Sequence, residues 1–268
     1  METRVSSFQI PLNNTVDKQM QSMLLPLTLL QIITLNLKYR IKNNVIIPNN
    51  LLHKFVLLCG TATCVLYAYT YRIFEIEKNI KAYKLVDVQY FAIYFDSCFY
   101  GFGLIMNVVV NLVQSRRNVA FVLNIQKVHR FINNEDNFKR LIYRNWISVI
   151  ILLGFYIISV ISYRVAYPGF PFYDTVNGIT LMNFDANIIY AIRLINLLTD
   201  KVVLWNHKVL NLCSNSHCEM SRDRLFQAYL QILKCYQIYK TVHQEMVSLT
   251  KWLCSSLKLY ICCLRREK

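Results

Sequence analysis

The residues best suited to bind a metal ion lie close together in one short segment. Cys213, His217 and Cys218 occur in the string CSNSHC, and His207 precedes them. Thiolate and imidazole groups are ligands that zinc favours. The pattern is a single C-x4-C without a second pair, however, and is weak evidence for a zinc site. We therefore interpret the segment as a solvated cytoplasmic loop and predict neither a metal nor a cofactor.

Motifs of the common enzyme classes are absent from the sequence. It contains no G-x-S-x-G, no P-loop, no G-x-G-x-x-G and no H-E-x-x-H. The string GFG at 101–103 lies within an apolar run, where glycine allows close helix packing more readily than phosphate binding. We predict that the protein is not an enzyme.

Two charged residues within apolar runs are the strongest candidates for a binding site. Asp96 lies within FAIYFDSCFYGFGLIMNVVVNLV and Arg193 within LMNFDANIIYAIRLINLLT. A lone charge inside a membrane costs about 2.5 to 3.5 kcal/mol on insertion scales, so each should face a partner or a wet cavity. If both helices run inward from residues 88 and 181, the two charges lie roughly 12 Å and 18 Å below the outer ends. We predict that they pair, with snorkelling of Arg193 or its satisfaction by a backbone carbonyl as the alternative.

Tyrosine residues are dense in the outer halves of the same runs. A tyrosine ring combines apolar area with a hydrogen-bonding hydroxyl, which suits a cavity for a small amphipathic molecule. Aromatic residues also form belts at membrane interfaces, and this interpretation stays open. The predicted ligand-binding residues are Tyr94, Asp96, Tyr100, Tyr163, Tyr190 and Arg193.

Long apolar runs are the elements that would position these residues. Of the 268 residues, 55% are hydrophobic and 17% are charged. The uncharged run 146–163 would reach about 27 Å as a helix, close to the ~30 Å hydrocarbon layer of a bilayer. We predict an all-α multi-pass membrane protein with four transmembrane helices, at about 53–73, 88–113, 146–165 and 181–212.

The two ends of the chain are predicted to lie outside the bilayer. The run 20–37 is apolar but is interrupted by Pro26, so we expect an interfacial or re-entrant helix there. We divide the chain into a cytoplasmic N-terminal region with this helix (1–50), transmembrane ligand-sensing helices (51–212), and a cytoplasmic anchor-like helix with a divergent tail (213–268).

The distribution of positive charge predicts the orientation. Lys and Arg number 30 against 15 acidic residues. They are concentrated in residues 1–50, in 114–145 and after 200, whereas 165–180 contains none. Positive loops face the cytoplasm, so both termini are expected there. This distribution explains the charge without nucleic acid, which we exclude as a partner.

Four stretches, taken in order, resemble a known family. They are the Pro-broken MLLPLTLLQIITLNLKYRIKNN, then QSRRNVAFVLNIQKVHRFINN, the fourth run continuing into VVLWNHKVLNL, and RLFQAYLQILKCYQIYKTVHQEM. Over roughly residues 20–248 this order resembles the front part of an insect gustatory receptor. The individual motifs are loose, and the match is one of pattern and order.

The resemblance implies a seven-helix chemoreceptor similar to odorant receptors, with its N-terminus inside. Such proteins assemble as tetrameric ligand-gated cation channels, with a tastant pocket in the outer halves of the first helices and a cytoplasmic anchor domain. Their last helix carries Thr-Tyr, five apolar residues and Gln-Phe. Here Thr70 and Tyr71 are followed by RIFEI, so we expect a partial form that lacks the pore.

The resemblance therefore implies a gustatory receptor subunit in the plasma membrane that detects small-molecule tastants. Its expected partners are the tastant, the lipid bilayer, and other gustatory receptor subunits in a homo- or hetero-tetramer. An odorant receptor-like chemoreceptor is one alternative function. A non-channel membrane transporter or scaffold is the other.

Overall fold

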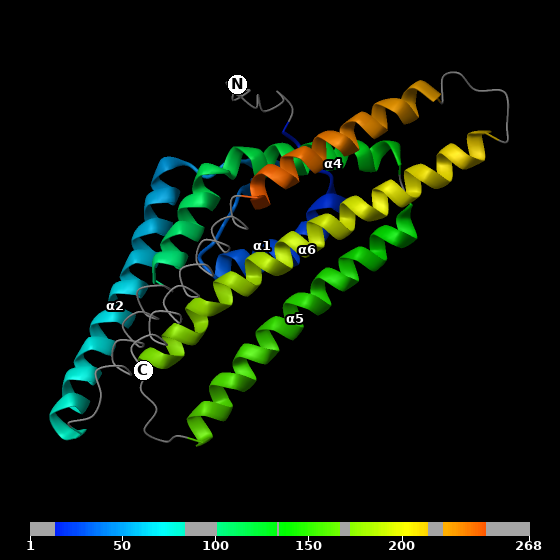
Figure 1. The fold of residues 1–268 in the computed structure, drawn as a ribbon. Coiled ribbons are helices and arrows are strands. Elements are labelled where there is room, and N and C mark those ends of the chain that lie inside the picture. The colour runs from blue at the N-terminus through cyan, green and yellow to red at the C-terminus, as the bar shows by residue number, and fades with distance from the viewer. Residues whose placement is uncertain (1–13, 84–100, 133, 167–171, 214–221, 245–268) are drawn as a thin grey trace, which may run out of the picture.

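The computed structural model shows a mostly helical chain (Figure 1). It describes residues 14–83, 101–132, 134–166, 172–213 and 222–244. The elements are α1 (Lys18–Ile33), β1 (Arg40–Lys42), β2 (Val45–Ile47), α2 (Leu51–Tyr83), a helix at Gly101–Val113, α4 (Ser115–Phe131), α5 (Glu135–Ala166), α6 (Phe172–Cys213) and a helix at 222–244. The predicted helical class is confirmed, apart from one small two-stranded sheet.

The hydrophobic core forms around α1, which packs against α5 and α6. One face of α1 is almost completely buried in a cluster shared with α4, α5, α6 and the helix 222–244. The opposite face exposes Leu25, Leu29, Ile32 and Ile33. Pro26 lies inside this helix. The segment predicted as an interfacial or re-entrant helix is thus apolar on two faces and forms part of the core with one of them.

The strands β1 and β2 form an antiparallel hairpin between α1 and α2. Asn43 and Asn44 make its two-residue turn with φ angles of 52° and 63°, left-handed values that a type I′ turn requires and that Asn tolerates. A bridge from Thr15 to Val45 joins the hairpin to the chain before α1. Strands of three residues are too short to show an alternating pattern, so the sequence analysis did not predict them.

Local capping explains where α2 and α5 begin. The Oδ1 atom of Asn50 accepts the N–H of His53, and Oδ1 of Asn134 accepts the N–H of Asn137, as expected of N-cap residues. Glu135 and Asp136 follow in the first turn of α5, where negative charge is favourable. The cap on α5 places its start well before the predicted span 146–165, whereas α2 starts close to the predicted residue 53 and continues past 73 to Tyr83.

The central helix is α6, which contacts α1, α2, α4 and α5 (Figure 1). It begins at Phe172 rather than near the predicted residue 181. Gly178 lies inside the helix, where an internal glycine costs only about 1 kcal/mol. With 42 residues α6 is about 63 Å long, twice the thickness of a bilayer's hydrocarbon layer.

Two side-chain contacts fix the antiparallel register of α5 and α6. The hydroxyl of Tyr156 donates to Oδ2 of Asp185 at 2.7 Å. Eight residues earlier on α5 and eight residues later on α6, Nη2 of Arg193 donates to Oγ of Ser148. The helix 222–244 then returns along the end of α6, where Trp205 Nε1 donates to the carbonyl of Leu225 at 2.8 Å.

Among the described residues, α5 is the helix that is long and apolar enough to cross a membrane. Only 17% of its most apolar stretch is buried, and Ile150, Ile151, Phe155, Ile157 and Ile158 are all exposed. The apolar stretches Leu51–Tyr67 and Gly101–Val113 are shorter. The coarser prediction of a helical chain with a membrane-compatible helix is therefore supported, and four crossings remain a prediction.

Candidate functional site

Two pairs of asparagines on facing helices form the centre of a buried polar junction. Asn107 and Asn111 lie one turn apart on the helix Gly101–Val113, and Asn183 and Asn187 lie one turn apart on α6. All four side chains are buried. Nδ2 of Asn107 donates to Oδ1 of Asn183 at 2.6 Å, and Nδ2 of Asn187 donates to the same oxygen at 3.2 Å.

The chain that follows α1 enters this junction as a tight turn. Leu35 has a φ angle of 53°, and the N–H of Asn36 donates back to the carbonyl of Gln31 at 2.8 Å. Nδ2 of Asn36 is a third donor to Oδ1 of Asn183, at 2.9 Å. In return, Nδ2 of Asn183 donates to the carbonyl of Thr34 at 2.7 Å. Asn183 therefore joins three separate parts of the chain.

Side chains also satisfy the rest of this irregular backbone. The carbonyl of Leu37 accepts a hydrogen bond from Nδ2 of Asn49, and the carbonyl of Lys38 accepts one from Oγ of Ser115 at 2.8 Å. The N–H of Lys38 donates to Oε1 of Gln31 at 3.3 Å. The junction thus pairs the carbonyls of Thr34, Leu37 and Lys38 and the N–H groups of Asn36 and Lys38.

Lys38 is the charged member of the junction and is fully buried. Its ammonium group donates to Oδ1 of Asn111 and lies 5.0 Å from the ring centroid of Tyr190. Within the described part of the chain, no carboxylate forms an ion pair with it. Burial lowers the pKa of Lys38 to about 7, because a charge removed from water without a counter-ion is unfavourable.

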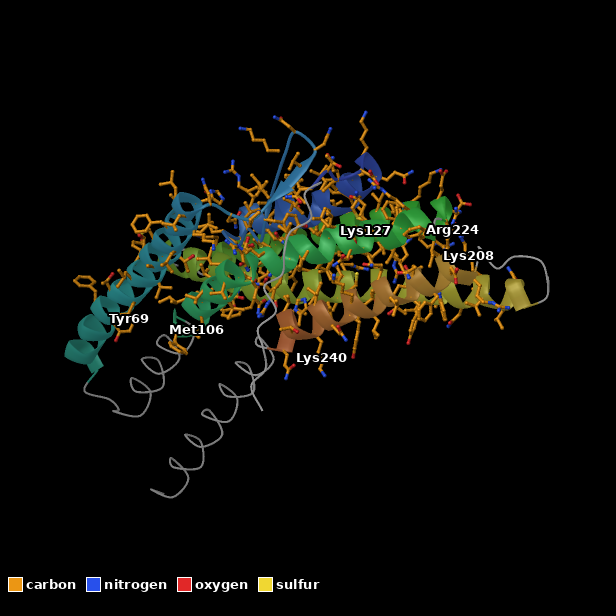
Figure 2. The ribbon with its side chains drawn as sticks, turned by 90° about the horizontal axis from the view of Figure 1, so that it is seen from above. Tyr69, Met106, Lys127, Lys208, Arg224 and Lys240 are labelled. Atoms are coloured by element: carbon orange, nitrogen blue, oxygen red, sulfur yellow. The ribbon has the colours of Figure 1, made fainter. Side chains whose placement is uncertain are left out.

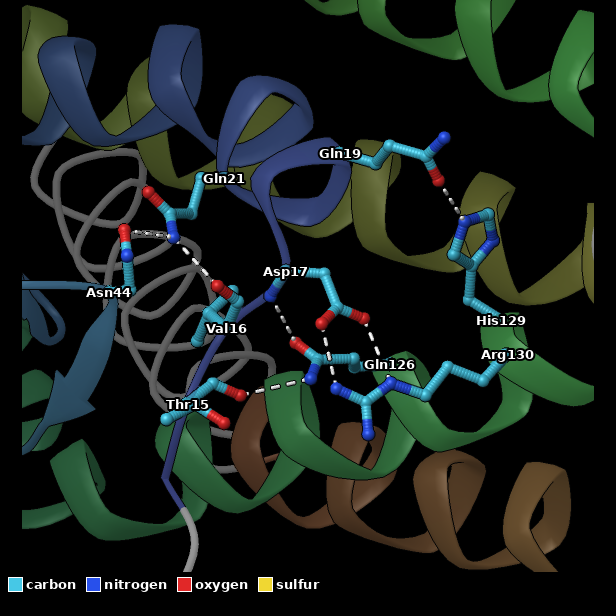
Figure 3. A network of polar contacts seen from close by, with 9 residues as sticks. All are labelled: Thr15, Val16, Asp17, Gln19, Gln21, Asn44, Gln126, His129 and Arg130. Atoms are coloured by element: carbon cyan, nitrogen blue, oxygen red, sulfur yellow. Dashed lines mark hydrogen bonds and ion pairs between the residues drawn. The ribbon is translucent and has the colours of Figure 1, made fainter.

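A second polar cluster joins α1 to α4 near the N-terminal end of α1 (Figure 3). Arg130 makes a bidentate ion pair with Asp17, at 2.9 and 2.7 Å. Oε1 of Gln126 accepts the N–H of Asp17, and its Nε2 donates to the carbonyl of Thr15. The hydrogen bond from Arg130 is the main cause that lowers the pKa of Asp17. These contacts hold the N-terminal end of α1 against α4.

The predicted ligand-binding residues fall in different places. Tyr94, Asp96 and Tyr100 lie outside the described residues. Tyr163 is 54% exposed on α5, whereas Tyr190 is buried against Lys38. From the register of α5 and α6, Tyr163 and Tyr190 are offset by twelve residues, or about 18 Å along the helices. The structure therefore does not bring these two tyrosines together.

Arg193 lies further along its helix than the sequence suggested. It follows Phe172 by 21 residues, about 32 Å from the start of α6. Its contact Ser148 lies near the start of the apolar run of α5. This placement puts Arg193 near one end of the apolar stretch, and its predicted pairing with Asp96 concerns a residue outside the described part.

Other sequence features can also be compared with the structure. A Cβ atom at Gly101 would lie 2.9 Å from Cγ1 of Val65 on α2, which confirms that this glycine allows close helix packing. The described residues contain no group of three or more potential metal ligands. His217 and Cys218 of the weak zinc pattern lie outside them.

The asparagine junction was missed by the sequence analysis. Its signal was the i, i+4 spacing of asparagines within two apolar runs, since such residues share one helix face. A polar residue in a membrane helix normally faces a protein partner. The partner segment 34–38, however, lies far away in sequence, and its residues 34–37 were interpreted as the end of the apolar run 20–37.

The chain matches no protein-family model, and it has no significant match among curated proteins or solved structures.

Proposed function

We propose that the chain is the ligand-sensing part, with some of the anchor domain, of a gustatory receptor. In this proposal it crosses the plasma membrane four times, through α2, the run 88–113, α5 and α6, with both termini in the cytoplasm. It acts as a subunit of a ligand-gated cation channel that detects small-molecule tastants. Other gustatory receptor subunits complete the tetramer and provide the pore.

The observation that carries this proposal is the two-part construction of α5 and α6. The later half of α5 exposes an almost continuous apolar surface, while its first half packs Phe138 and Leu141 into the core beside basic residues. Likewise, α6 continues beyond Thr199 into a half that contacts α4 and the helix 222–244. Helices that pass without a break from an exposed apolar half into a packed basic half suit a receptor with a cytoplasmic anchor domain.

The position of α1 beside the cytoplasmic ends of two proposed spans is a second support. Its sixteen residues span about 24 Å, and the chain turns back at residues 34–38 beside Asn183. Asn183 follows the start of α6 by eleven residues, which corresponds to about 16 Å. The carbonyls of Leu37 and Lys38 also accept hydrogen bonds from Asn49 and Ser115, which directly flank the proposed spans α2 and 88–113. If those helices cross the bilayer, this turn lies at their cytoplasmic ends.

Gating in this proposal is a shift of population. A tastant that binds the open conformation more tightly than the closed one moves the equilibrium by its differential affinity. The outer pocket near Tyr94, Asp96 and Tyr100 remains the proposed binding region. The junction at Asn183 then connects the ligand-sensing helices to α1, which packs on the basic half of α5.

Topology and current measurements test the proposal. The chain, with an epitope tag at each terminus, is expressed in cultured cells with a full-length gustatory receptor subunit. We expect resistance to alkaline extraction, staining of both tags only after permeabilisation, and a cation current whose response to sugars and bitter compounds differs from that of the partner alone. A chain released by alkaline extraction, or stained on intact cells, would contradict the proposal.

A control variant separates specific assembly from expression. Asn183→Leu disrupts the junction without touching the proposed outer pocket, and it should reduce the altered current when its surface level matches that of the wild type. If the chain reaches the membrane but neither associates with any receptor subunit nor changes its current, a non-channel scaffold replaces the receptor proposal.

A further inference from the structure

The β1–β2 hairpin presents two positive charges on one face. Arg40 and Lys42 are both exposed, and residues two apart on a strand point to the same side. Ile41 and its partner Ile46 lie on the opposite face, where Ile46 is fully buried. Figure 2 shows the hairpin projecting from the body of helices. The positive face is therefore directed away from the core.

The hairpin is held in place by contacts with the start of α1. The N–H of Val16 donates to the carbonyl of Asn44 at 2.7 Å, and the N–H of Ile46 donates to the carbonyl of Asn14 at 2.9 Å. Nε2 of Gln21 also donates to Oδ1 of Asn44 at 3.0 Å (Figure 3). Together with the left-handed Asn turn, these bonds give the two cations a fixed position.

Exposed apolar side chains stand on both sides of the hairpin. Before it, Ile32, Ile33 and Leu35 are exposed at the end of α1. After it, Leu51 is 86% exposed and Leu52 is 70% exposed in the first turn of α2. Cations that directly flank apolar surface on a membrane protein lie at the level of the lipid headgroups.

This part of the chain carries no negative charge of its own. Residues 18–74 contain six Lys or Arg residues and neither Asp nor Glu. Asp17, just before them, is already paired with Arg130. The segment therefore offers no carboxylate of its own to pair with the hairpin charges, which leaves them open to an external anion.

We propose that the Arg40–Lys42 face of the hairpin binds the phosphate groups of anionic phospholipids in the cytoplasmic leaflet. This inference depends on the membrane location within the proposed function, but not on ligand detection or conduction. Fixed cations at headgroup depth attract anionic lipid by about fivefold each, so the pair favours it by roughly twenty- to thirtyfold over zwitterionic lipid.

The test measures which lipids remain bound to the purified full-length chain. The protein is reconstituted in nanodiscs of phosphatidylcholine with one tenth phosphatidylserine, then released and analysed by native mass spectrometry. The wild type should retain phosphatidylserine in excess of its share. Arg40→Gln with Lys42→Gln should lose most of that excess at low salt, and Arg40→Lys should keep it.

Lys127→Gln with Lys240→Gln is the matched control. Both lysines are exposed, and they lie on α4 and on the helix 222–244 (Figure 2). Their replacement removes the same charge as the hairpin double variant. The control should retain anionic lipid like the wild type. Equal retention by both double variants, or an equal loss from both, overturns the proposal. Lipid-independent capture of an acidic protein by the hairpin, lost in the Gln variant, also overturns it.

The two proposals can fail separately. A chain that retains anionic lipid through the hairpin but never alters a receptor current contradicts the receptor proposal alone. A chain that alters the current while its hairpin variant retains lipid normally contradicts the lipid inference alone.

Discussion

The ammonium group of Lys201 on α6 lies 2.8 Å from Nδ1 of His129 on α4. An ammonium group can only donate, so Nδ1 accepts and the ring proton is on Nε2, which lies 3.2 Å from Oε1 of Gln19. The imidazole is therefore neutral. Burial, and then the charge of Lys201, lower the pKa of His129 to about 4.

This neutral histidine makes stability depend on pH below neutrality. The folded-state pKa of about 4 lies below the ordinary 6.5, so its stabilising contribution is complete above pH 6.5 and is lost as the pH falls through 4. Melting temperatures in detergent at pH 7 and pH 4.5 measure the loss. His129→Gln should show a smaller decrease than the wild type, whereas His207→Gln, at an exposed position, should follow the wild type. Identical curves for the wild type and His129→Gln would refute the assignment.

Lys38 should make the unfolding free energy depend on pH above neutrality. Its pKa is about 7 when folded and 10.5 in an ordinary environment, so the folded state binds fewer protons between these values. The free energy of unfolding should therefore rise with pH in this window. Lys38→Met should reduce that rise, with the remainder due to buried Lys201, whose pKa is lowered to about 8. Lys127→Met should leave the rise unchanged. The check is the melting temperature at pH 7 and pH 9.5, and an unchanged pH dependence in Lys38→Met counts against a buried amine.

Asn183 should be the most sensitive residue of the junction. Replacing it with Leu leaves the side-chain donors of Asn36 and Asn107 without their shared acceptor, whereas Asn187 still donates to the backbone carbonyl of residue 183. Each unmet buried group costs about 1–3 kcal/mol. We expect a loss of roughly 2–5 kcal/mol in unfolding free energy. Asn187→Leu removes only donor groups and should cost about 1 kcal/mol. Comparable losses of unfolding free energy in the two variants would show that Asn183 is not the main hydrogen-bonding residue of the junction.

The ion pair between Arg130 and Asp17 should matter little despite its good geometry. The two side chains are 55% and 39% exposed, and exposed pairs contribute about 0–1 kcal/mol. Asp17→Asn should therefore lower the unfolding free energy by less than about 1 kcal/mol, with the difference shrinking in high salt. Denaturant titrations at two salt concentrations measure it, and a large, salt-independent loss would contradict this estimate.

The apolar run of α5 was the most predictable part of the fold. An uncharged stretch bounded by Arg144 and Arg164 identifies a helix from composition alone. Helix ends were less predictable, because α5 begins at a cap on Asn134 and α6 begins directly after a proline. Such local hydrogen bonds extend a helix beyond its apolar part without changing hydropathy.

The site was predictable only in outline. A charge within an apolar run predicted a partner or a wet cavity, and Arg193 does contact Ser148. The sequence could not show that Lys38, counted as a basic flank, folds into a buried junction with Asn111. That contact joins residues 73 positions apart in the chain, and pattern along one helix carries no information about such a partner.

The shared register of α5 and α6 restricts how this molecule can move. Sliding one helix past the other by a single turn, about 5.4 Å, would separate Tyr156 from Asp185 and Arg193 from Ser148 in the same step. We therefore expect α5 and α6 to move together as one rigid body. Relative motion is then confined to the contacts of this pair with α1, α2 and α4.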